Sequence, residues 1–234
     1  MNLDLLPVRT GGAAENMAAD FLLLQRYPDE SRARFRHYGW RAPAFTFGYS
    51  QKIETVRAAL ADPEAFDLCR RPTGGAIVDH SDDWTYALVA PRGSSFEEMR
   101  AAQSYRAVHE ALAAALHAQG IPGELNQTPA SNSERSLCFA KAELYDIIHA
   151  GTGEKIAGAA QKRNKQGLLC QGSLWRPAIG GALIDWDELL EDFATRLAAA
   201  LGGAVQAVPW PEWEEEEVSG LTERYASPEW IEMR

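Results

Sequence analysis

Residues 70–80 read RRPTGGAIVDH, and residues 155–161 read KIAGAAQ. The first stretch joins two arginines, a pair of glycines, an apolar pair and a histidine. Because glycine has no side chain and tolerates positive φ, Gly74 and Gly75 let the backbone approach a ligand closely. On its own, a Gly-Gly pair between strands is more typical of a tight hairpin, and paired arginines at a strand end are more typical of surface charge. Their combination in one short stretch indicates a binding site.

A single cysteine, Cys138, lies between these two stretches in a polar, loop-like run. A free thiol has a pKa of about 8.5 and is only a few per cent thiolate at neutral pH. The ammonium of Lys155 would stabilise the thiolate and polarise a carbonyl, so the pair favours a thioester-handling acyltransferase with Cys138 as nucleophile. The competing interpretation of Cys138 is a small buried hydrophobic residue, as most free cysteines are. Cys69 and Cys170 fall in strand-like runs, and we interpret both as core residues.

The chain has 234 residues, enough for one large domain or two small ones, and 46% of them are apolar. Its net charge of −10 argues against general nucleic-acid binding, which needs a basic surface. The three cysteines show no CxxC and no metal-ligand spacing, which favours a reduced cytoplasm and predicts no metal site. The chain opens without a basic-then-apolar leader, and no apolar run approaches about 20 residues. We therefore expect neither a signal peptide nor a membrane span.

Periodicity and turn signals predict a mixture of helices and strands. Helices are expected over residues 13–25, 56–61, 95–119 and 185–201. Strands are expected over residues 34–40, 44–49, 66–71, 84–90, 143–150, 155–162 and 168–175, the last three joined by hairpin turns. Residues 127–142 are polar and irregular, which indicates a functional loop. We predict a single α+β domain over residues 1–234, with a mixed, largely antiparallel sheet flanked by helices and a partly helical tail over 209–234.

The run RRPTGG, followed by His80 and by TYALV at residues 85–89, resembles the cofactor-transferase family. That family contains lipoate–protein ligases, octanoyltransferases and, more distantly, biotin ligases, and the resemblance implies their class II synthetase-like fold. It extends from about residue 16 to about residue 174. Residues 16–20, 40–51, 155–161 and 168–173 are similar to the family's opening helix, W-x-x-P…G-Y-x-Q strand pair, K-x-x-G-S-A-Q strand and L-L-x-H-G-S strand.

Within this family, Cys138 resembles the nucleophile of the octanoyltransferases, and Lys155 resembles the lysine that meets the acyl carbonyl. The resemblance implies transfer of an octanoyl or lipoyl group from an acyl carrier protein to Cys138. The group would then pass to a lysine of a lipoyl-domain protein or of a glycine-cleavage H-type protein. Neither a metal nor a bound cofactor is implied. The substrate-binding residues that the resemblance implies are Arg71, Thr73, Gly74, Gly75, His80, Gly158 and Gln161.

Three positions depart from the family's pattern. Ala76 replaces a third glycine, Ser81 replaces the aspartate that usually follows the histidine, and Gln171 replaces a second histidine. His80 has therefore either lost an orienting carboxylate or uses Asp82 instead. These departures leave the acyl donor open.

Two other functions also remain open. An ATP-dependent lipoate–protein ligase would use ATP and magnesium, with Arg70, Arg71 and Lys155 holding an acyl-adenylate and Cys138 incidental. Many such ligases carry a small accessory domain for which this chain leaves little room, and that lowers the ligase alternative. A non-catalytic acyl-binding relative would have kept the pocket and lost the chemistry, an alternative motivated by the changes at Ser81 and Gln171.

Two groups of basic residues stand out against the negative net charge. We interpret each as solvated surface, although either would also suit an acidic lipoyl-domain or carrier-protein partner. They are Arg32, Arg34, Arg36, His37 and Arg41 near one strand pair, and Lys162, Arg163 and Lys165 near a turn.

Overall fold

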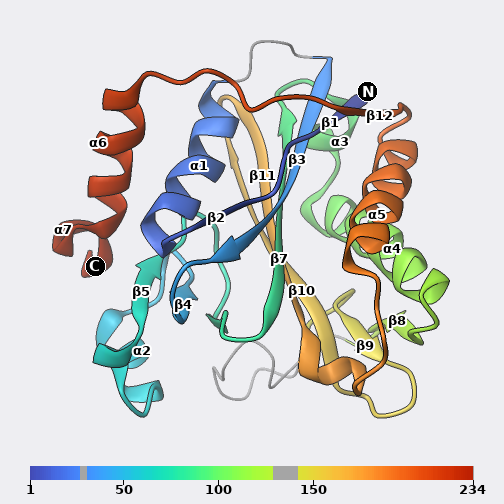
Figure 1. The fold of residues 1–234 in the computed structure, drawn as a ribbon, viewed down its shortest axis with the longest axis horizontal. Helices are drawn as coiled ribbons and strands as arrows, with labels where there is room; N and C mark the ends of the chain where they lie inside the picture. Colours follow the sequence, from blue (N-terminus) through green and yellow to red (C-terminus); the bar gives the residue numbers. More distant parts are fainter. Residues whose placement is uncertain (27–30, 129–141, 234) are drawn as a thin grey trace.

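The computed structural model describes residues 1–26, 31–128 and 142–233, and Figure 1 shows its fold. The larger of two sheets has the strand order β12-β1-β3-β7-β11-β10-β9-β8, with β2 paired to β3. Its strands are β1 (Asn2–Leu5), β2 (Arg9–Gly11), β3 (Arg32–Trp40), β7 (Asp83–Pro91), β8 (Gly123–Leu125), β9 (Ile147–His149), β10 (Lys155–Asn164), β11 (Gly167–Trp175) and β12 (Val205–Ala207). Pairing is antiparallel from β3 through to β8, and parallel where β1 meets β3 and β12 and where β2 meets β3. The predicted α+β class with a mixed, largely antiparallel sheet is confirmed.

Helices cover both faces of this sheet (Figure 1). The helices of the described residues are α1 (Ala13–Gln25), α2 (Ile53–Ala59), α3 (Ser95–Glu98), α4 (Ala101–Ala118), α5 (Trp186–Ala200), α6 (Glu215–Ala226) and α7 (Pro228–Ile231), of which α2 packs on the smaller sheet. The main core lies between the sheet and the pair α4 and α5, where Phe35 of β3 meets Phe193 of α5 edge-on at 5.2 Å between ring centroids. On the opposite face, Leu23 and Leu24 of α1 pack on Leu169 of β11. None of the described helices is long and apolar enough to cross a membrane.

Local sequence signals explain most of these elements. The helix expected over residues 13–25 has the same bounds as α1. Helix α4 places Val108, Leu112 and Leu116 on one buried stripe, the spacing that an amphipathic helix needs. Asp185 caps the N-terminus of α5, and its carboxylate accepts the backbone N–H groups of residues 187 and 188. The C-terminal stretch is partly helical, as predicted, and α6 packs on α1 through Tyr225.

Two sequence predictions were wrong in detail. The single helix expected over residues 95–119 is divided into α3 and α4, because Met99 and Arg100 between them have extended backbone conformations. The strand expected over residues 143–150 is reduced to β9, because Tyr145 has φ of +69°, a left-handed conformation that no strand accommodates. The bend at residues 143–146 brings Asp146 back beside β10, which matters for the site described below.

The Gly74-Gly75 pair does not form a hairpin. The smaller sheet has the order β5-β4-β6, with β4 (Ala44–Phe47) in the centre, β5 (Asp67–Arg70) parallel to it and β6 (Ile77–Asp79) antiparallel to it. The connection from β5 to β6 therefore crosses the end of β4. Gly48, which follows β4, has to be a glycine because a Cβ there would overlap the carbonyl oxygen of Gly75. Residues 71–76, called the glycine loop below, form this connection and lie against Gly48 at the end of β4.

Candidate active site

Arg71 supports the glycine loop from within. Its side chain is buried, and its guanidinium donates to Thr46 Oγ1 at 2.8 Å and to the carbonyl oxygens of Gly74 and Ala76 at 2.8 and 3.0 Å. These bonds fix the conformation in which Gly75 has φ of +93°. An ideal Cβ on Gly75 would lie 3.7 Å from the Cβ of Ala160, so the loop faces β10 at van der Waals distance. Arg71 thus shapes this surface, and its direct contact with substrate stays a prediction.

Thr73 links the glycine loop to the centre of the larger sheet. Its hydroxyl donates to Gln171 Oε1 at 2.7 Å, and Gln171 Nε2 donates to Asp20 Oδ2 at 2.7 Å. Asp20 is fully buried and forms an ion pair with Arg36 at 2.6 Å. Gln171 is the residue that replaces a histidine of the family pattern. It serves as a neutral two-ended connector, because its amide offers an acceptor to Thr73 and a donor to Asp20.

His80 does have an orienting carboxylate. The partner is Asp83, so both alternatives drawn from the sequence, a lost carboxylate or Asp82, are wrong: His80 Nδ1 lies 2.7 Å from Asp83 Oδ2. On the other side of the ring, Nε2 lies 2.7 Å from Thr46 Oγ1, and the ring stacks on Trp40 at 3.9 Å. Burial alone would raise the pKa of Asp83, but the charge of His80 and hydrogen bonds from neighbouring groups hold that pKa below its ordinary value. His80 therefore anchors β6 and β7 to β4, and its contact with substrate stays a prediction.

Lys155 is held by a carboxylate that the sequence did not single out. Its Nζ lies 2.7 Å from Asp146 Oδ2, and only 5% of the Lys155 side chain and 1% of the Asp146 side chain are exposed. Asp146 also accepts the backbone N–H of Glu143 at 2.7 Å and the hydroxyl of Tyr105. The Tyr105 oxygen in turn accepts the backbone N–H of Ala159 at 3.0 Å. One signal was available: a lysine buried in a strand needs a carboxylate nearby, and Asp146 is close in the chain.

Strand β10 turns its smallest residues toward the glycine loop. Successive residues of a strand face opposite sides of the sheet, so Gly158 and Ala160 share the face that meets Gly75. Both are half-buried and carry at most a methyl group. Gln161 lies on the other face, where its Oε1 accepts Ser104 Oγ of α4 at 3.1 Å. The structure thus places Ala160 of β10 against the glycine loop and Gly158 against Lys155, and it separates Gln161 from them.

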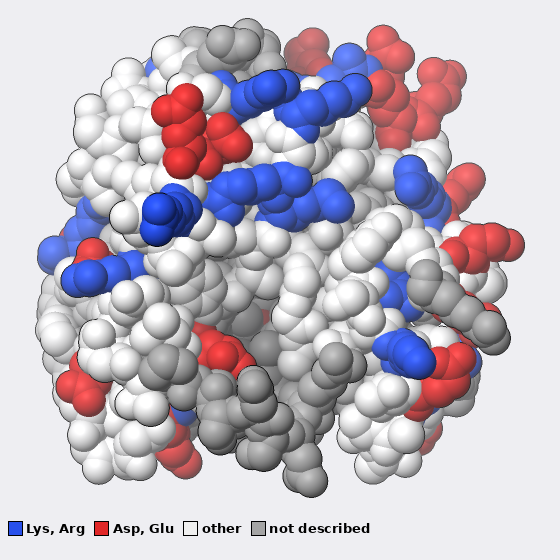
Figure 2. Space-filling model, turned by 180° about the vertical axis from the view of Figure 1, so that it is seen from behind, with Lys and Arg blue, Asp and Glu red and all other residues white. Residues whose placement is uncertain are grey.

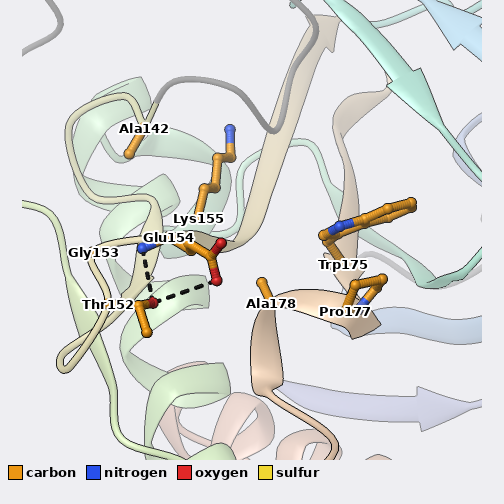
Figure 3. Close-up of a pocket in the computed structure, with 8 residues that line it drawn as sticks. All are labelled: Ala142, Thr152, Gly153, Glu154, Lys155, Trp175, Pro177 and Ala178. Atoms are coloured by element: carbon orange, nitrogen blue, oxygen red, sulfur yellow. Dashed lines mark hydrogen bonds between the residues drawn. The ribbon is translucent and has the colours of Figure 1, made fainter.

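A hollow of about 390 Å³ opens beside Lys155 (Figure 3). One side of it is formed by the turn between β9 and β10, where Thr152 Oγ1 lies 3.5 Å from the carboxylate of Glu154. Trp175 and Pro177 form the facing side. The complete lining consists of Ala142, Thr152, Gly153, Glu154, Lys155, Trp175, Pro177 and Ala178. Lys155 therefore contributes to the wall of this space.

The structure describes two of the three cysteines. Cys138, the predicted nucleophile, lies outside the described residues. Cys69 and Cys170 are buried, as predicted. Burial raises the pKa of the Cys170 thiol to about 12, and it raises the pKa of Cys69 further still. Neither of these two thiols supplies a thiolate at neutral pH.

Arg70 cannot bind an adenylate in this conformation, which corrects its role in the ligase alternative. Its guanidinium is buried and donates to five backbone carbonyl oxygens at 2.6–2.9 Å. These carbonyls belong to Tyr49, Gln51, Trp230, Ile231 and Met233. The residue joins the C-terminal helix α7 to the strand that leads into the glycine loop.

The first basic group is solvated surface only in part, which corrects that interpretation: Arg41 is exposed, whereas two members are buried. Arg34 and Arg36 are buried, and Arg32 and Arg41 form ion pairs with Asp4 and Glu15. At the second group, Lys165 is exposed and the guanidinium of Arg163 donates to the carbonyl oxygens of Glu97 and Met99. Figure 2 shows that Lys and Arg side chains gather in bands across the upper half of the face opposite to that of Figure 1, above a hollowed region.

Comparison with known proteins places this geometry in a family. Residues 12–176 match the family model of the lipoyl protein ligase A/B catalytic domain. The chain belongs to this family. Among curated relatives, it is 30% identical over 164 residues to the octanoyltransferase LipM of Oceanobacillus iheyensis, covering 69% of this chain and 59% of that one. It is 31% identical over 163 residues to the octanoyltransferase LipM of Carboxydothermus hydrogenoformans, covering 69% and 60%.

These matches span about 60% of the length of those two relatives. A third octanoyltransferase LipM, from an Exiguobacterium species, is 25% identical over an alignment of 273 positions. This alignment covers 98% of each chain. Among solved structures, lipoate-protein ligase A bound with ATP has a TM-score of 0.77 at 20% identity, with 99% of each chain covered. The structure of protein Ta0514 of T. acidophilum with bound lipoic acid has a TM-score of 0.74 at 19% identity, again with 99% of each chain covered. At these identities the structures show the shared fold.

Proposed function

We propose that this chain is an acyltransferase of lipoyl-cofactor assembly, which moves an octanoyl group from a carrier-protein thioester to a lysine of a lipoyl-domain protein. The observation that carries the proposal is the buried Lys155–Asp146 pair packed against Gly158, across from the glycine loop. A fixed ammonium beside a strip of residues without large side chains suits an acyl carbonyl with its chain lying along the backbone. The relatives named octanoyltransferase LipM support the choice of octanoyl transfer.

The reaction has two steps. In the first, the Cys138 thiolate attacks the donor's carbonyl carbon, a new sulfur–carbon bond forms, and the carrier leaves as a thiol after taking up a proton. In the second, the neutral amine of an acceptor lysine attacks the acyl-enzyme, an amide bond forms, and the thiolate of Cys138 is released as the amine loses its proton. Each step passes through a tetrahedral oxyanion. The Lys155 ammonium stabilises that negative charge, and in a water-poor site such stabilisation is stronger than in bulk water.

The surroundings of Lys155 fit this role. Asp146 holds the ammonium in one position, so little reorganisation is needed when charge develops on the carbonyl oxygen. The hollow between Glu154 and Trp175 offers the acceptor lysine an approach that does not pass the glycine loop. Exposed basic residues such as Lys165 on a chain of net charge −10 suit an acidic partner protein.

An ATP-dependent ligase is the second candidate, because lipoate-protein ligase A bound with ATP shares this fold. In that reaction Arg71 and Lys155 would hold an acyl-adenylate, and ATP with magnesium would be required. The carbonyl contacts of Arg70 count against it, since they occupy one of the cations assigned to the adenylate.

Intact-mass measurement separates the two candidates. We expect octanoyl-carrier protein alone to add one octanoyl group to the enzyme, and hydroxylamine to remove it. The Cys138→Ala variant should take no label, whereas Cys69→Ala and Cys170→Ala should still be labelled. A Cys138→Ala enzyme that acylates a lipoyl domain from free octanoate and ATP would overturn the transferase proposal in favour of the ligase.

A further inference from the structure

Tyr145 has a backbone conformation that its side chain does not favour. It is the only non-glycine residue of the described chain with positive φ, at +69°. Tyrosine lacks the local hydrogen bonds that let asparagine adopt this region, so the conformation persists only if its surroundings enforce it. The next residue is Asp146, the partner of Lys155. The contacts that hold Tyr145 in this conformation therefore lie directly beside the buried ion pair of the candidate active site.

Both polar groups of the Tyr145 backbone are held. Its N–H donates to the carbonyl oxygen of Asn126 at 2.8 Å, and its carbonyl oxygen lies 2.7 Å from His109 Nδ1. A carbonyl only accepts, so Nδ1 of His109 carries the proton. Burial lowers the pKa of His109 to about 4, and the ring is therefore neutral at physiological pH. Neutral His109 therefore has one N–H donor, at Nδ1, and this donor binds the carbonyl oxygen of Tyr145.

Tyr105, one helical turn before His109 on α4, holds the side chain of Asp146. Tyr105 and His109 are four residues apart on α4 and lie edge to face, with ring centroids 4.3 Å apart. Tyr105 donates its hydroxyl to Asp146 Oδ1, while Lys155 Nζ lies on Oδ2. One face of α4 thus forms two hydrogen bonds with this segment. One is to the carbonyl oxygen of Tyr145 and the other is to the carboxylate of Asp146.

We propose that His109 and Tyr105 are positioning residues for Lys155, acting through the strained Tyr145 peptide and the Asp146 carboxylate. The role of Lys155 in catalysis rests on the proposed function, but the coupling of α4 to the Lys155 ammonium does not. His109 fixes the direction in which the Asp146 side chain leaves the backbone, and Tyr105 fixes the rotation of its carboxylate. Without them the ammonium loses its single position.

The test measures the exposure of the Lys155 amine in the free protein. A limiting amount of acetic anhydride is applied at constant pH, and mass spectrometry compares acetylation of Lys155 with that of exposed Lys165 as an internal reference. We expect His109→Phe to raise the Lys155-to-Lys165 ratio several-fold, as Asp146→Asn should. His109→Asn should stay near wild type, because the asparagine Nδ2 offers a donor where histidine has Nδ1.

A double-mutant comparison tests the strain itself. Glycine adopts positive φ without cost, so Tyr145→Gly in the His109→Phe background should return the Lys155 ratio toward wild type. If His109→Phe fails to fold, Tyr105→Phe keeps the ring and removes only the hydroxyl, and it should raise the same ratio. Wild-type ratios in every folded variant would overturn the proposal.

Octanoyl loading gives a second readout and separates the two proposals. In an enzyme that loads, His109→Phe should lower the loading rate at saturating donor by about tenfold to a hundredfold and leave the half-saturating donor concentration unchanged. If the wild-type protein takes no octanoyl group, the proposed function fails, whereas the acetylation ratios still decide the positioning role.

Discussion

Gly158 has no room for a side chain because the Lys155 ammonium occupies that space. An ideal Cβ at Gly158 would lie 2.8 Å from Lys155 Nζ and 2.9 Å from Asp146 Oδ1. The glycine is therefore a packing requirement of the ion pair as well as part of the strip that faces the glycine loop. This relationship also explains why a lysine at the start of β10 is buried instead of extending into solvent.

Gly158→Ala should separate Lys155 from Asp146. We expect a loss of about 1–3 kcal/mol of unfolding free energy from overpacking, together with a large decrease in octanoyl loading. The matched control is Gly74→Ala, because a Cβ there meets nothing within 4 Å. Thermal unfolding would be measured for both variants, and loading rate for Gly158→Ala against wild type. Equal unfolding midpoints for the two variants would contradict the packing argument.

Gly75→Val should obstruct the acyl path beside Ala160. The added side chain points toward β10, so octanoyl loading should decrease strongly and butyryl loading less, since a shorter chain extends less far past the obstruction. Strain at φ of +93° adds about 1–3 kcal/mol of destabilisation. Thermal midpoints separate that strain from the obstruction. Wild-type octanoyl loading by Gly75→Val would mean that the glycine loop does not line the acyl site.

Alkylation should single out Cys138. With the pKa of Cys170 raised by burial to about 12 and that of Cys69 higher, neither reacts appreciably with iodoacetamide at neutral pH. Lys155→Ala should slow the alkylation of Cys138, and raising the pH should restore much of the rate. Peptide mapping after timed alkylation measures this. An unchanged pH profile in Lys155→Ala would show that the two residues do not interact in the free enzyme.

Acid should destabilise the fold through His109. Burial depresses its pKa to about 4, whereas in the unfolded chain it returns to about 6.5. Between these two pH values the unfolded state therefore binds more protons than the folded state. The contribution of His109 to the free energy of unfolding is complete above about pH 6.5 and is lost as the pH falls toward 4, by about 3 kcal/mol in total.

His37 has a lowered pKa as well and acts in the same direction, so the comparison has to be made between proteins that both retain it. Urea unfolding of wild type and His109→Asn across this pH range isolates the contribution of His109. The variant should show the shallower dependence. Parallel curves for the two proteins would refute the assignment.

Arg70 should matter for stability more than any exposed arginine. Arg70→Met would leave five buried or partly buried carbonyl oxygens without their donor, and we expect a loss of about 3 kcal/mol or more. Arg57→Met is the control, because its ion pair with Glu232 is about half exposed and worth at most about 1 kcal/mol. Urea denaturation of both variants provides the measurement. A smaller effect at Arg70 than at Arg57 would be inconsistent with its carbonyl contacts.

Local patterns were enough to predict α1, the long strands of the larger sheet and the position of the glycine loop. Each of these depends on periodicity or on residues next to one another in the chain. The short strands β1, β2, β6, β8 and β12 were missed, because three or four residues carry no usable period. Lys155 was singled out through family resemblance, whereas its partner Asp146 was placed in a strand that the Tyr145 backbone excludes.

Partner choice among buried polar groups was decided by the tertiary structure. Thr73 and Gln171 are 98 residues apart, and Arg70 and Ile231 are 161 apart, yet each pair forms a hydrogen bond of 2.7 Å. Burying such a group costs free energy unless a partner meets it, and which partner does so depends on how distant segments pack. The amino-acid sequence by itself therefore determines which positions are small, charged or apolar. Only the packing of β10, α4 and the glycine loop specifies which of them meet around Lys155.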